Sequence, residues 1–337
     1  MKINRTELVT QLEMVMPGTS AKDIIEQSTC FVFKDGMVIT FNDDMACMHK
    51  TQLNITGAIQ AKVFLNLLKK LTEETLIITA DKNELLIKGK RKKAGLVMES
   101  EVLLPIDTLE KPKKWKSLPD GFIEAIDLVK SCASKDEAMF TLTCVHISKD
   151  FIEACDTYQA ARVLINTPVK QSILVRKDSL IHLKNTSMTH FSETDSWVHF
   201  KNKDGLVISC RRYVEEYQTD EITNILKMGG KNVKLPSGLC DAIENAELLA
   251  MDNADENIVL LKITAPDDLI IKGTGIYGWY TEKAKIKYSG GKELRFGISP
   301  KILIDVLKKQ TKIQIGKEVL KVKDGNFSYV SCLEAGK

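Results

Sequence analysis

Hairpin turns recur along this sequence at a nearly constant interval, and that interval limits the architectures available to it. Tight two-residue turns favour Gly, Asn and Asp, which tolerate a positive φ, and short segments rich in these residues separate alternating β-type segments. Six such turns are at Lys34–Gly36, Asp81–Asn83, Lys149–Asp150, Lys203–Gly205, Pro266–Asp268 and Asp324–Gly325. Asp35, Asp150 and Asp267 are 115 and 117 residues apart, and positions 82, 204 and 324 are 122 and 120 residues apart. The sequence therefore predicts three tandem repeats of about 115–120 residues.

Two series of helices are expected at the same interval. The first would begin near Thr6, Asp120 and Ser237, and its apolar side chains recur at helical spacing, as Leu8 and Leu12 do in the first helix. The second series covers residues 60–71, 178–184 and 299–310. Each repeat is thus a doubled pattern of strand, helix and hairpin. Because it is too long for a solenoid repeat, it is expected to be a small α+β domain with its own core.

Two polar segments divide the chain at the ends of the repeats. Residues 111–119 are basic and contain Pro112 and Pro119, and residues 227–232 contain the pair Gly229-Gly230. These segments place domain limits near 115 and 229. We therefore expect domains over residues 1–115, 116–228 and 229–337.

The composition excludes several protein classes without deciding the function. A chain of 337 residues with 44% hydrophobic and 28% charged residues is neither fibrous nor disordered. Its 48 basic and 45 acidic residues give a net charge of +3, so any nucleic-acid binding must depend on where the lysines are placed. The sequence has no signal-peptide pattern and no uncharged apolar run of about 18 residues. We expect a soluble, cytoplasmic protein.

The cysteines and histidines indicate neither a metal site nor a cofactor. The eight cysteines never form a CxxC motif, and most lie within apolar runs, as Cys210 does. In a chain of this length they are interpreted as reduced core thiols. The five histidines form no HxH or HExxH pair. No cofactor is expected.

The two helix series differ in charge. The first is acidic outside its apolar face, with Glu7, Glu124 and Asp241 among its carboxylates, whereas the second is rich in lysine. If symmetry placed the second series on one surface, its lysines would contact a regular negative backbone without reading bases. The alternative is that each lysine simply lies on a solvated helix face.

A search for catalytic motifs finds little. No phosphate-binding GxxxxGK[ST], GxGxxG or GxSxG segment is present. His146, Cys155 and Asp156 flank one hairpin and could form a thiol nucleophile with a base. Cys155 lies in an apolar and polar alternation, with no glycine-rich or helix-start context to lower its pKa. We expect that the protein is not an enzyme.

Four stretches resemble the bacterial-type β sliding clamp, the beta subunit of DNA polymerase III, in a divergent form such as a phage could encode. They are residues 1–8, 61–71, 154–162 and 298–307. The resemblance covers essentially the whole chain and agrees with the threefold repeat, although no single motif is highly specific. It implies three tandem clamp domains, with antiparallel sheets outside and two helices of each domain inside.

The resemblance also implies a function. Two such subunits close head to tail into a homodimeric ring around duplex DNA, and this processivity factor tethers the replicative DNA polymerase after a clamp loader has placed it. The residues that would face DNA are lysines that follow the first helices or belong to the second series: Lys22, Lys62, Lys69, Lys70, Lys135, Lys184, Lys301, Lys308 and Lys309.

Family members bind short partner peptides in a hydrophobic pocket between domains two and three. By position, the pocket here would involve Cys155, Thr157, Tyr158, Gln159, Ala160, Val330, Cys332 and Leu333. Tyr158-Gln159-Ala160 replaces the family's His-Arg-Leu, which changes the expected peptide specificity more than the pocket. Two alternatives stay open: a monomeric clamp homologue that binds peptides without encircling DNA, and a thiol enzyme using Cys155 and His146.

Overall fold

The computed structural model describes the chain except for residues 237, 251–257, 265, 288–292, 299, 301–303, 305–311, 317 and 333–337. The chain forms two compact units. The first consists of Met1–Ile123 with Asp178–Tyr213, and the second of Glu124–Lys177 with Val214–Lys337. No helix in the described part is long and apolar enough to cross a membrane.

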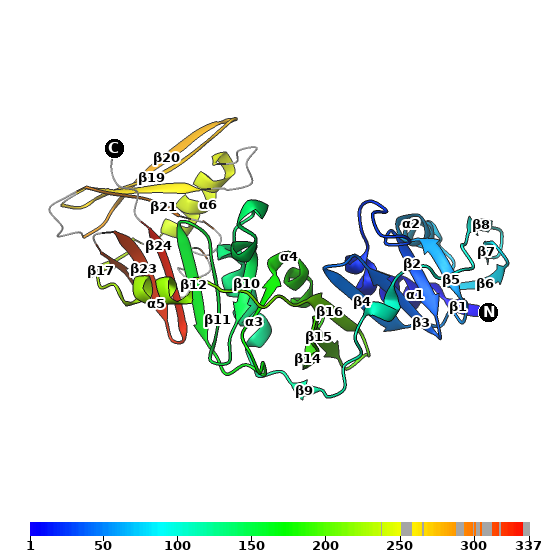
Figure 1. The fold of residues 1–337 in the computed structure, drawn as a ribbon. Helices are drawn as coiled ribbons and strands as arrows, with labels where there is room; N and C mark the ends of the chain where they lie inside the picture. Colours follow the sequence, from blue (N-terminus) through cyan, green and yellow to red (C-terminus); the bar gives the residue numbers. More distant parts are fainter. Residues whose placement is uncertain are drawn as a thin grey trace. The chain divides into compact units, whose positions relative to one another are not determined.

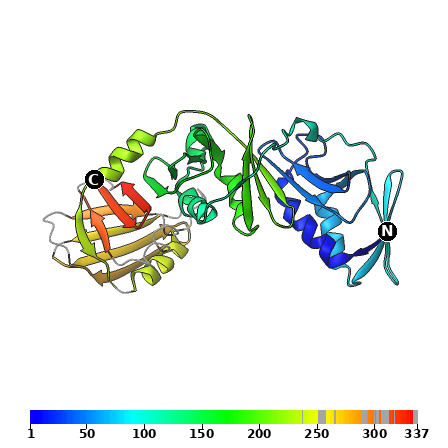
Figure 2. The same cartoon turned by 90° about the horizontal axis from the view of Figure 1, so that it is seen from below.

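The first unit contains an eight-stranded and a four-stranded antiparallel sheet (Figure 1). The larger has the order β5-β2-β3-β4-β16-β15-β14-β9, and the smaller β1-β6-β7-β8. The larger sheet contains β2 Cys30–Lys34, β3 Met37–Phe41, β4 Met45–Lys50, β5 Gly57–Gln60, β9 Lys116–Ser117, β14 Met188–Glu193, β15 Trp197–Asn202 and β16 Val207–Arg211. The smaller sheet contains β1 Lys2–Asn4, β6 Thr75–Asp81, β7 Glu84–Lys88 and β8 Lys93–Val97. The N-terminus lies beside the small sheet, where the Met1 ammonium donates to the Ile78 carbonyl at 2.7 Å (Figure 2).

The second unit repeats this arrangement. Its larger sheet has the order β13-β10-β11-β12-β24-β23-β22-β17, and its smaller sheet β20-β19-β18-β21. The larger contains β10 Cys144–Ile147, β11 Phe151–Cys155, β12 Gln159–Leu164, β13 Ile173–Arg176, β17 Lys231–Lys234, β22 Lys312–Ile315, β23 Val319–Asp324 and β24 Phe327–Cys332. The smaller contains β18 Val259–Thr264, β19 Asp268–Gly275, β20 Gly278–Lys285 and β21 Leu294–Ile298.

Helices accompany these sheets. Among the described residues, the α-helices are α1 Arg5–Val15, α2 Ala61–Lys70, α3 Phe122–Val129, α4 Lys177–Leu180, α5 Thr219–Lys227 and α6 Leu239–Leu249. Short 3₁₀ helices are η1 Met16–Gly18, η2 Ile106–Thr108, η3 Lys130–Cys132, η4 Glu137–Thr143 and η5 Ile181–Leu183. In the first unit α1 and α2 contact each other, α1 also contacts β3 and β4, and α2 contacts β2 and β5. In the second unit α6 lies on β18, β19 and β20, and α5 contacts β24. The fold is therefore α+β with antiparallel sheets, as expected.

All six expected hairpins are present, pairing β2 with β3, β6 with β7, β10 with β11, β15 with β16, β18 with β19, and β23 with β24. The first turn shows why the signal was readable. Asp35 and Gly36 adopt φ values of 52° and 71°, the left-handed region that these two residue types tolerate.

The helix boundaries differ from the expectation in several places. The α1 helix begins before Thr6, because the Asn4 side chain accepts a hydrogen bond from the Glu7 amide at 3.0 Å and caps the helix. In the region expected as residues 178–184, the structure has only the short α4 and η5. The expected helix at 299–310 lies almost wholly outside the described residues. The α5 helix is a further difference, because the sequence predicts only a linker over residues 227–232 in this region.

Pairing between repeats explains why the compact units are two and not three. The β4 strand pairs with β16, and β12 pairs with β24, so each eight-stranded sheet combines strands from two neighbouring sequence repeats. At the first junction, Phe41 and Trp197 are both buried with ring centroids 5.8 Å apart. The limits 1–115, 116–228 and 229–337 therefore divide sequence repeats that share cores, and they stay a prediction as domain boundaries.

Candidate functional site

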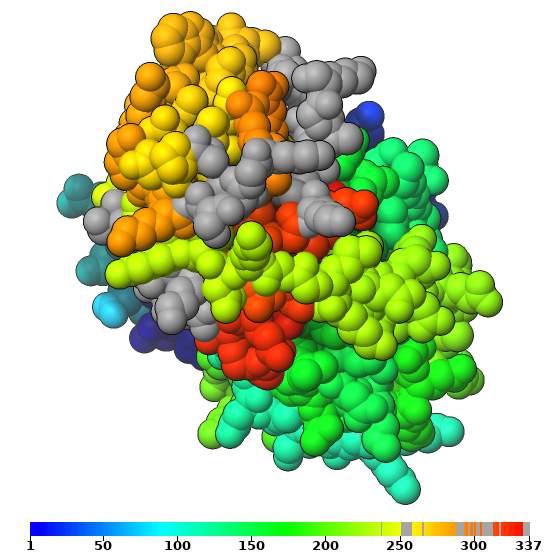
Figure 3. Space-filling view, turned by 90° about the vertical axis from the view of Figure 1, so that its left-hand side faces the viewer, coloured from blue at the N-terminus to red at the C-terminus, as the bar shows by residue number. Residues whose placement is uncertain are grey.

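A cavity of about 240 Å³ opens on the second unit. Four elements contribute to it: η4, the turn that joins β11 to β12, the end of β24, and α5. The yellow-green segment that contains α5 lies beside the red strands β23 and β24 in Figure 3. The lining residues are Leu142, Cys155, Asp156, Thr157, Tyr158, Gln159, Ala160, Gln218, Glu221, Ile222, Ile225, Val330 and Cys332.

The turn between β11 and β12 is held by Asp156. Its Oδ1 accepts hydrogen bonds from the amides of Tyr158 at 2.7 Å and Gln159 at 2.8 Å, and its Oδ2 accepts from the Gln159 side-chain amide at 2.9 Å. The Cys332 amide donates to the Tyr158 carbonyl at 2.7 Å, which fixes this turn to the end of β24. Tyr158 lines the cavity and is 62% exposed, so it lies at the rim of the cavity.

The α5 helix forms the opposite part of the lining through its apolar side. Ile222 is buried and Ile225 partly buried in a cluster with Leu142, Ala160 and Val330. At the far end of the helix the Lys321 ammonium donates to the Leu226 carbonyl. The apolar side of α5 therefore packs into the core of this unit and is not exposed to solvent along its length.

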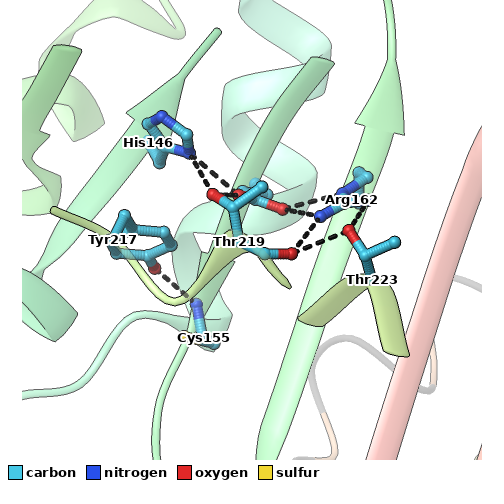
Figure 4. Close-up of polar contacts among 7 residues, drawn as sticks. His146, Cys155, Arg162, Tyr217, Thr219 and Thr223 are labelled. Atoms are coloured by element: carbon cyan, nitrogen blue, oxygen red, sulfur yellow. Dashed lines mark hydrogen bonds and ion pairs between the residues drawn. The ribbon is translucent and has the colours of Figure 1, made fainter. Parts of the chain in front are cut away.

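A buried polar network holds the start of α5 against the sheet (Figure 4). Its centre is Glu153, which is fully buried on β11. One carboxylate oxygen lies 2.8 Å from His146 Nδ1 and accepts from the Thr219 hydroxyl at 2.7 Å. The other accepts from Arg162 Nε at 2.7 Å and lies 2.5 Å from Arg162 Nη2. Both carboxylate oxygens are thus satisfied.

Arg162 and Tyr217 extend this network to the helix and the cavity. The guanidinium donates to the Thr223 hydroxyl at 2.9 Å and to the Thr219 carbonyl at 3.2 Å. The Cys155 amide donates to the Tyr217 hydroxyl at 2.9 Å. Figure 4 shows these side chains converging from the sheet and from the segment that leads into α5. The position of the cavity wall is therefore set by polar contacts as well as by apolar packing.

The structure brings together most of the expected pocket residues. Seven of them line the cavity: Cys155, Thr157, Tyr158, Gln159, Ala160, Val330 and Cys332. Leu333 lies outside the described residues. Sequence reasoning missed the lining residues Leu142, Asp156, Gln218, Glu221, Ile222 and Ile225. The spacing of Ile222, Ile225 and Leu226 after an acidic first turn is the signal that could have revealed α5.

The expected DNA-facing lysines can be placed in part. Lys62, Lys69 and Lys70 are exposed on α2, but Lys69 forms an ion pair with Glu13 of α1 at 2.6 Å. Lys22 and Lys184 are exposed in the first unit, and Lys135 is exposed in the second. Lys301, Lys308 and Lys309 lie outside the described residues.

The geometry argues against a thiol nucleophile at Cys155. His146 is engaged by Glu153 and Thr219, and burial raises the pKa of the Cys155 thiol to about 11, against the smaller lowering effect of its Tyr217 contact. A nucleophilic cysteine needs the opposite shift, because only the thiolate attacks. The arrangement is that of a core cysteine beside a structural network.

We expect Cys155 to resist alkylation at neutral pH in the folded protein. With a pKa of about 11, only about one thiol in 10⁴ is ionised at pH 7, and this fraction rises tenfold per pH unit until the pH nears the pKa. Peptide mapping after iodoacetamide treatment between pH 7 and pH 10 measures this. The same protein in urea is the control, since an unfolded thiol titrates near about 8.5. Rapid alkylation of folded Cys155 at pH 7 would contradict the expectation.

No family model and no curated protein matches this sequence. Solved structures match it over its whole length. The DNA polymerase III beta chain of Streptococcus pneumoniae is 17% identical with a TM-score of 0.78, and the match covers 99% of both chains. The DNA polymerase sliding clamp of Bacillus subtilis is 18% identical with a TM-score of 0.76, and the match covers 100% of this chain and 99% of that one.

The chain has the sliding-clamp fold. The beta subunit of Thermotoga maritima supports the same assignment, with a TM-score of 0.74 at 15% identity over 100% of this chain and 99% of that one.

Within this sliding-clamp fold, strand pairing leaves two complementary edges. The β4, β12 and β20 strands occupy corresponding positions in the repeats, as do β16, β24 and β8. The first set pairs with the second at β4–β16 and β12–β24, whereas β8 and β20 end their sheets in the described part of the chain.

The backbone hydrogen bonds show which amides these two edge strands leave open. The Met98 amide donates to the Asn83 carbonyl. Because hydrogen-bonded and non-hydrogen-bonded residue pairs alternate along antiparallel strands, the amide of Val97 points away from β7. The same alternation leaves the Trp279 amide on the open side of β20.

Proposed function

We propose that this protein is a DNA sliding clamp, a non-enzymatic processivity factor that encircles duplex DNA as a head-to-tail homodimer. The observation that carries the proposal is the match of the complete fold to DNA polymerase III beta subunits over at least 99% of the chain. A clamp loader would place the ring on DNA, and the ring would tether the replicative polymerase in the cytoplasm. Residues 1–115, 116–228 and 229–337 would be its three clamp domains.

The open edges of β8 and β20 support the homodimer. An uncovered strand edge offers unpaired amides and carbonyls to another chain. Pairing β20 of one copy with β8 of the next would repeat the β4–β16 and β12–β24 pairings. In the proposed homodimer, such pairing at both ends of each copy would close a ring of two.

The exposed lysines of α2 support weak contacts with phosphates. Phosphate contacts position a protein without reading sequence, and this suits a ring that must move along DNA. Within the proposal the DNA-facing set is Lys22, Lys62, Lys69, Lys70, Lys135, Lys184, Lys301, Lys308 and Lys309. The cavity of the second unit would accept short segments of partner proteins, with Cys155, Thr157, Tyr158, Gln159, Ala160, Val330, Cys332 and Leu333 as its expected residues.

Retention on closed DNA tests the proposal. Protein loaded onto a nicked circular plasmid by a clamp loader should remain bound in gel filtration at a salt concentration that removes ordinary phosphate contacts. Cutting the circle with a restriction enzyme should release it. Equal loss from circular and linear DNA would reject encirclement, and a solution mass of one chain would favour the monomeric homologue.

We expect Lys62 and Lys70 to contribute to the salt dependence of DNA binding. Replacing either by Ala should reduce the slope of log K against log salt by about 1, because one phosphate contact is lost. Lys69→Ala should change the slope less, since Lys69 already pairs with Glu13. Filter binding to a short duplex at several salt concentrations measures this, with Lys50→Ala on β4 as the control. Equal slopes for Lys50→Ala and Lys62→Ala would contradict the assignment.

A further inference from the structure

The charged residues that line the cavity in the described part of the chain are all acidic, and this affects which ligands the cavity can bind. Two carboxylates line it, Asp156 from the turn after β11 and Glu221 from α5, and none of the described lining residues is basic. All three hydrogen bonds that Asp156 accepts come from neutral amides, so they orient the carboxylate without cancelling its charge. The remaining lining is mainly apolar, with Ile222, Ile225 and Val330 among its side chains.

The segment before α5 and the first turn of the helix add to this negative potential. Glu215, Glu216 and Asp220 are all exposed, as is Glu221. Four carboxylates within seven residues attract cations to this face over roughly a Debye length, about 8–10 Å at physiological salt. The nearest basic residue of α5 is Lys227, at the other end of the helix.

The rim offers a second feature that suits a cation. Tyr158 is 62% exposed, lines the cavity and belongs to the same turn as Asp156. An aromatic face attracts Lys or Arg through its quadrupole, and Arg also stacks on it. Carboxylate and aromatic ring together are a combination that favours a basic side chain over a neutral or acidic one.

The wall that carries Glu221 is fixed before any partner binds. Near its start Arg162 donates to the Thr219 carbonyl and the Thr223 hydroxyl, and at its end Lys321 donates to the Leu226 carbonyl. A preformed wall spares a ligand the cost of ordering a loop. The charge of the wall is therefore presented to a ligand at a defined place beside the apolar cavity.

We propose that the cavity binds a partner segment in which an apolar side chain is followed directly by Arg or Lys. This inference rests on the proposed role of the cavity as a partner-peptide site. The apolar side chain fills the space between α5, Ala160 and Val330, and the basic side chain lies against Asp156, Glu221 and the Tyr158 ring. Specificity would then come from the charged rim, while the apolar cavity would supply affinity.

Three fluorescein-labelled peptides test this by fluorescence anisotropy. They share the frame Gly-Ser-Leu-Phe-X-Ser-Gly, with Arg, Gln or Glu at X. We expect the Arg peptide to bind about fivefold more tightly than the Gln peptide, a ratio typical of one or two partly exposed charge contacts, and the Glu peptide to bind most weakly. The preference should shrink as salt is raised from about 50 to about 500 mM, because the contacts are at the rim.

Matched variants distinguish the effect of the two lining carboxylates from the effect of the net charge of the protein. The variant Asp156→Asn with Glu221→Gln keeps the shape of both side chains and should bring the Arg and Gln peptides to equal affinity. The variant Glu216→Gln changes the net charge but removes no lining residue, and should preserve the preference.

The outcomes are distinct from those of the clamp proposal. Tighter binding of the Glu peptide, or an Arg preference that survives in the double variant, would overturn the inference. Absence of binding by all three peptides at about 1 mM would overturn it as well, and would remove the peptide role of the cavity. Retention on circular DNA is measured without peptide, so its failure would reject encirclement and leave the peptide result standing.

Discussion

The variant Glu153→Gln is expected to lower the free energy of unfolding of the second unit by about 3–5 kcal/mol, since it leaves a buried guanidinium without its charged partner. Glu153 is fully buried, and its two oxygens satisfy His146, Arg162 and Thr219. Scanning calorimetry measures the change. For a unit of this size each kcal/mol corresponds to roughly 2–4 °C in Tm.

A matched ion pair in the same unit is the control. Glu137 pairs with Arg176, but its side chain is 62% exposed, so Glu137→Gln should cost no more than about 1 kcal/mol. Replacing Glu153 and Arg162 together by Leu should cost less than Glu153→Gln alone, because no uncompensated charge remains. If Glu153→Gln matched Glu137→Gln, the network would not be the anchor of α5 that its geometry indicates.

The variant Val97→Pro is expected to weaken the proposed dimer by roughly tenfold or more, since it deletes an amide that would pair across copies and leaves the partner's carbonyl unsatisfied. The Val97 amide faces the open side of β8, and its side chain is 82% exposed, so pairing with β7 should survive the change. Sedimentation equilibrium measures the dissociation constant, and the half-life on nicked circles should fall with it.

The control for this edge is Val97→Thr, which keeps the amide and a β-branched side chain and should dimerise as the parent does. Circular dichroism of both variants establishes that the sheet is intact. Equal dimer constants for the two variants would place the interface elsewhere than at β8.

The sequence predicted the elements whose causes are local. Turns such as Asp35-Gly36 depend on φ preferences of the residues in the turn, so all six hairpins could be found. The apolar faces of α1 and α6 follow from spacing alone. The pairings of β4 with β16 and of β12 with β24 could not be read in this way, because an edge strand and a central strand carry the same alternation.

The candidate site shows the same division. Tyr158 and Cys332 came from a resemblance to known clamps and do line the cavity. The α5 wall was missed because no capping side chain marks its start: Gln218 has no side-chain capping bond, and the first turn is instead tied to the sheet where Arg162 donates to the Thr219 carbonyl and the Thr223 hydroxyl. The role of Glu153 was unreadable for a related reason, since a lone Glu in an apolar strand has no visible partner until strands β10, β11 and β12 are aligned.

Because the large sheets are shared between repeats, the repeating unit of the sequence and the compact unit of the structure are different. What repeats along the sequence is a stretch of about 115–120 residues, but each compact unit combines one whole repeat with half of the middle repeat, joined edge to edge. A fragment that ends at residue 115 would lack β16 and would expose the unpaired edge of β4. Such an exposed edge promotes aggregation. Recombination among such proteins should therefore succeed where whole sheets are exchanged, at crossovers that ignore the repeat boundaries.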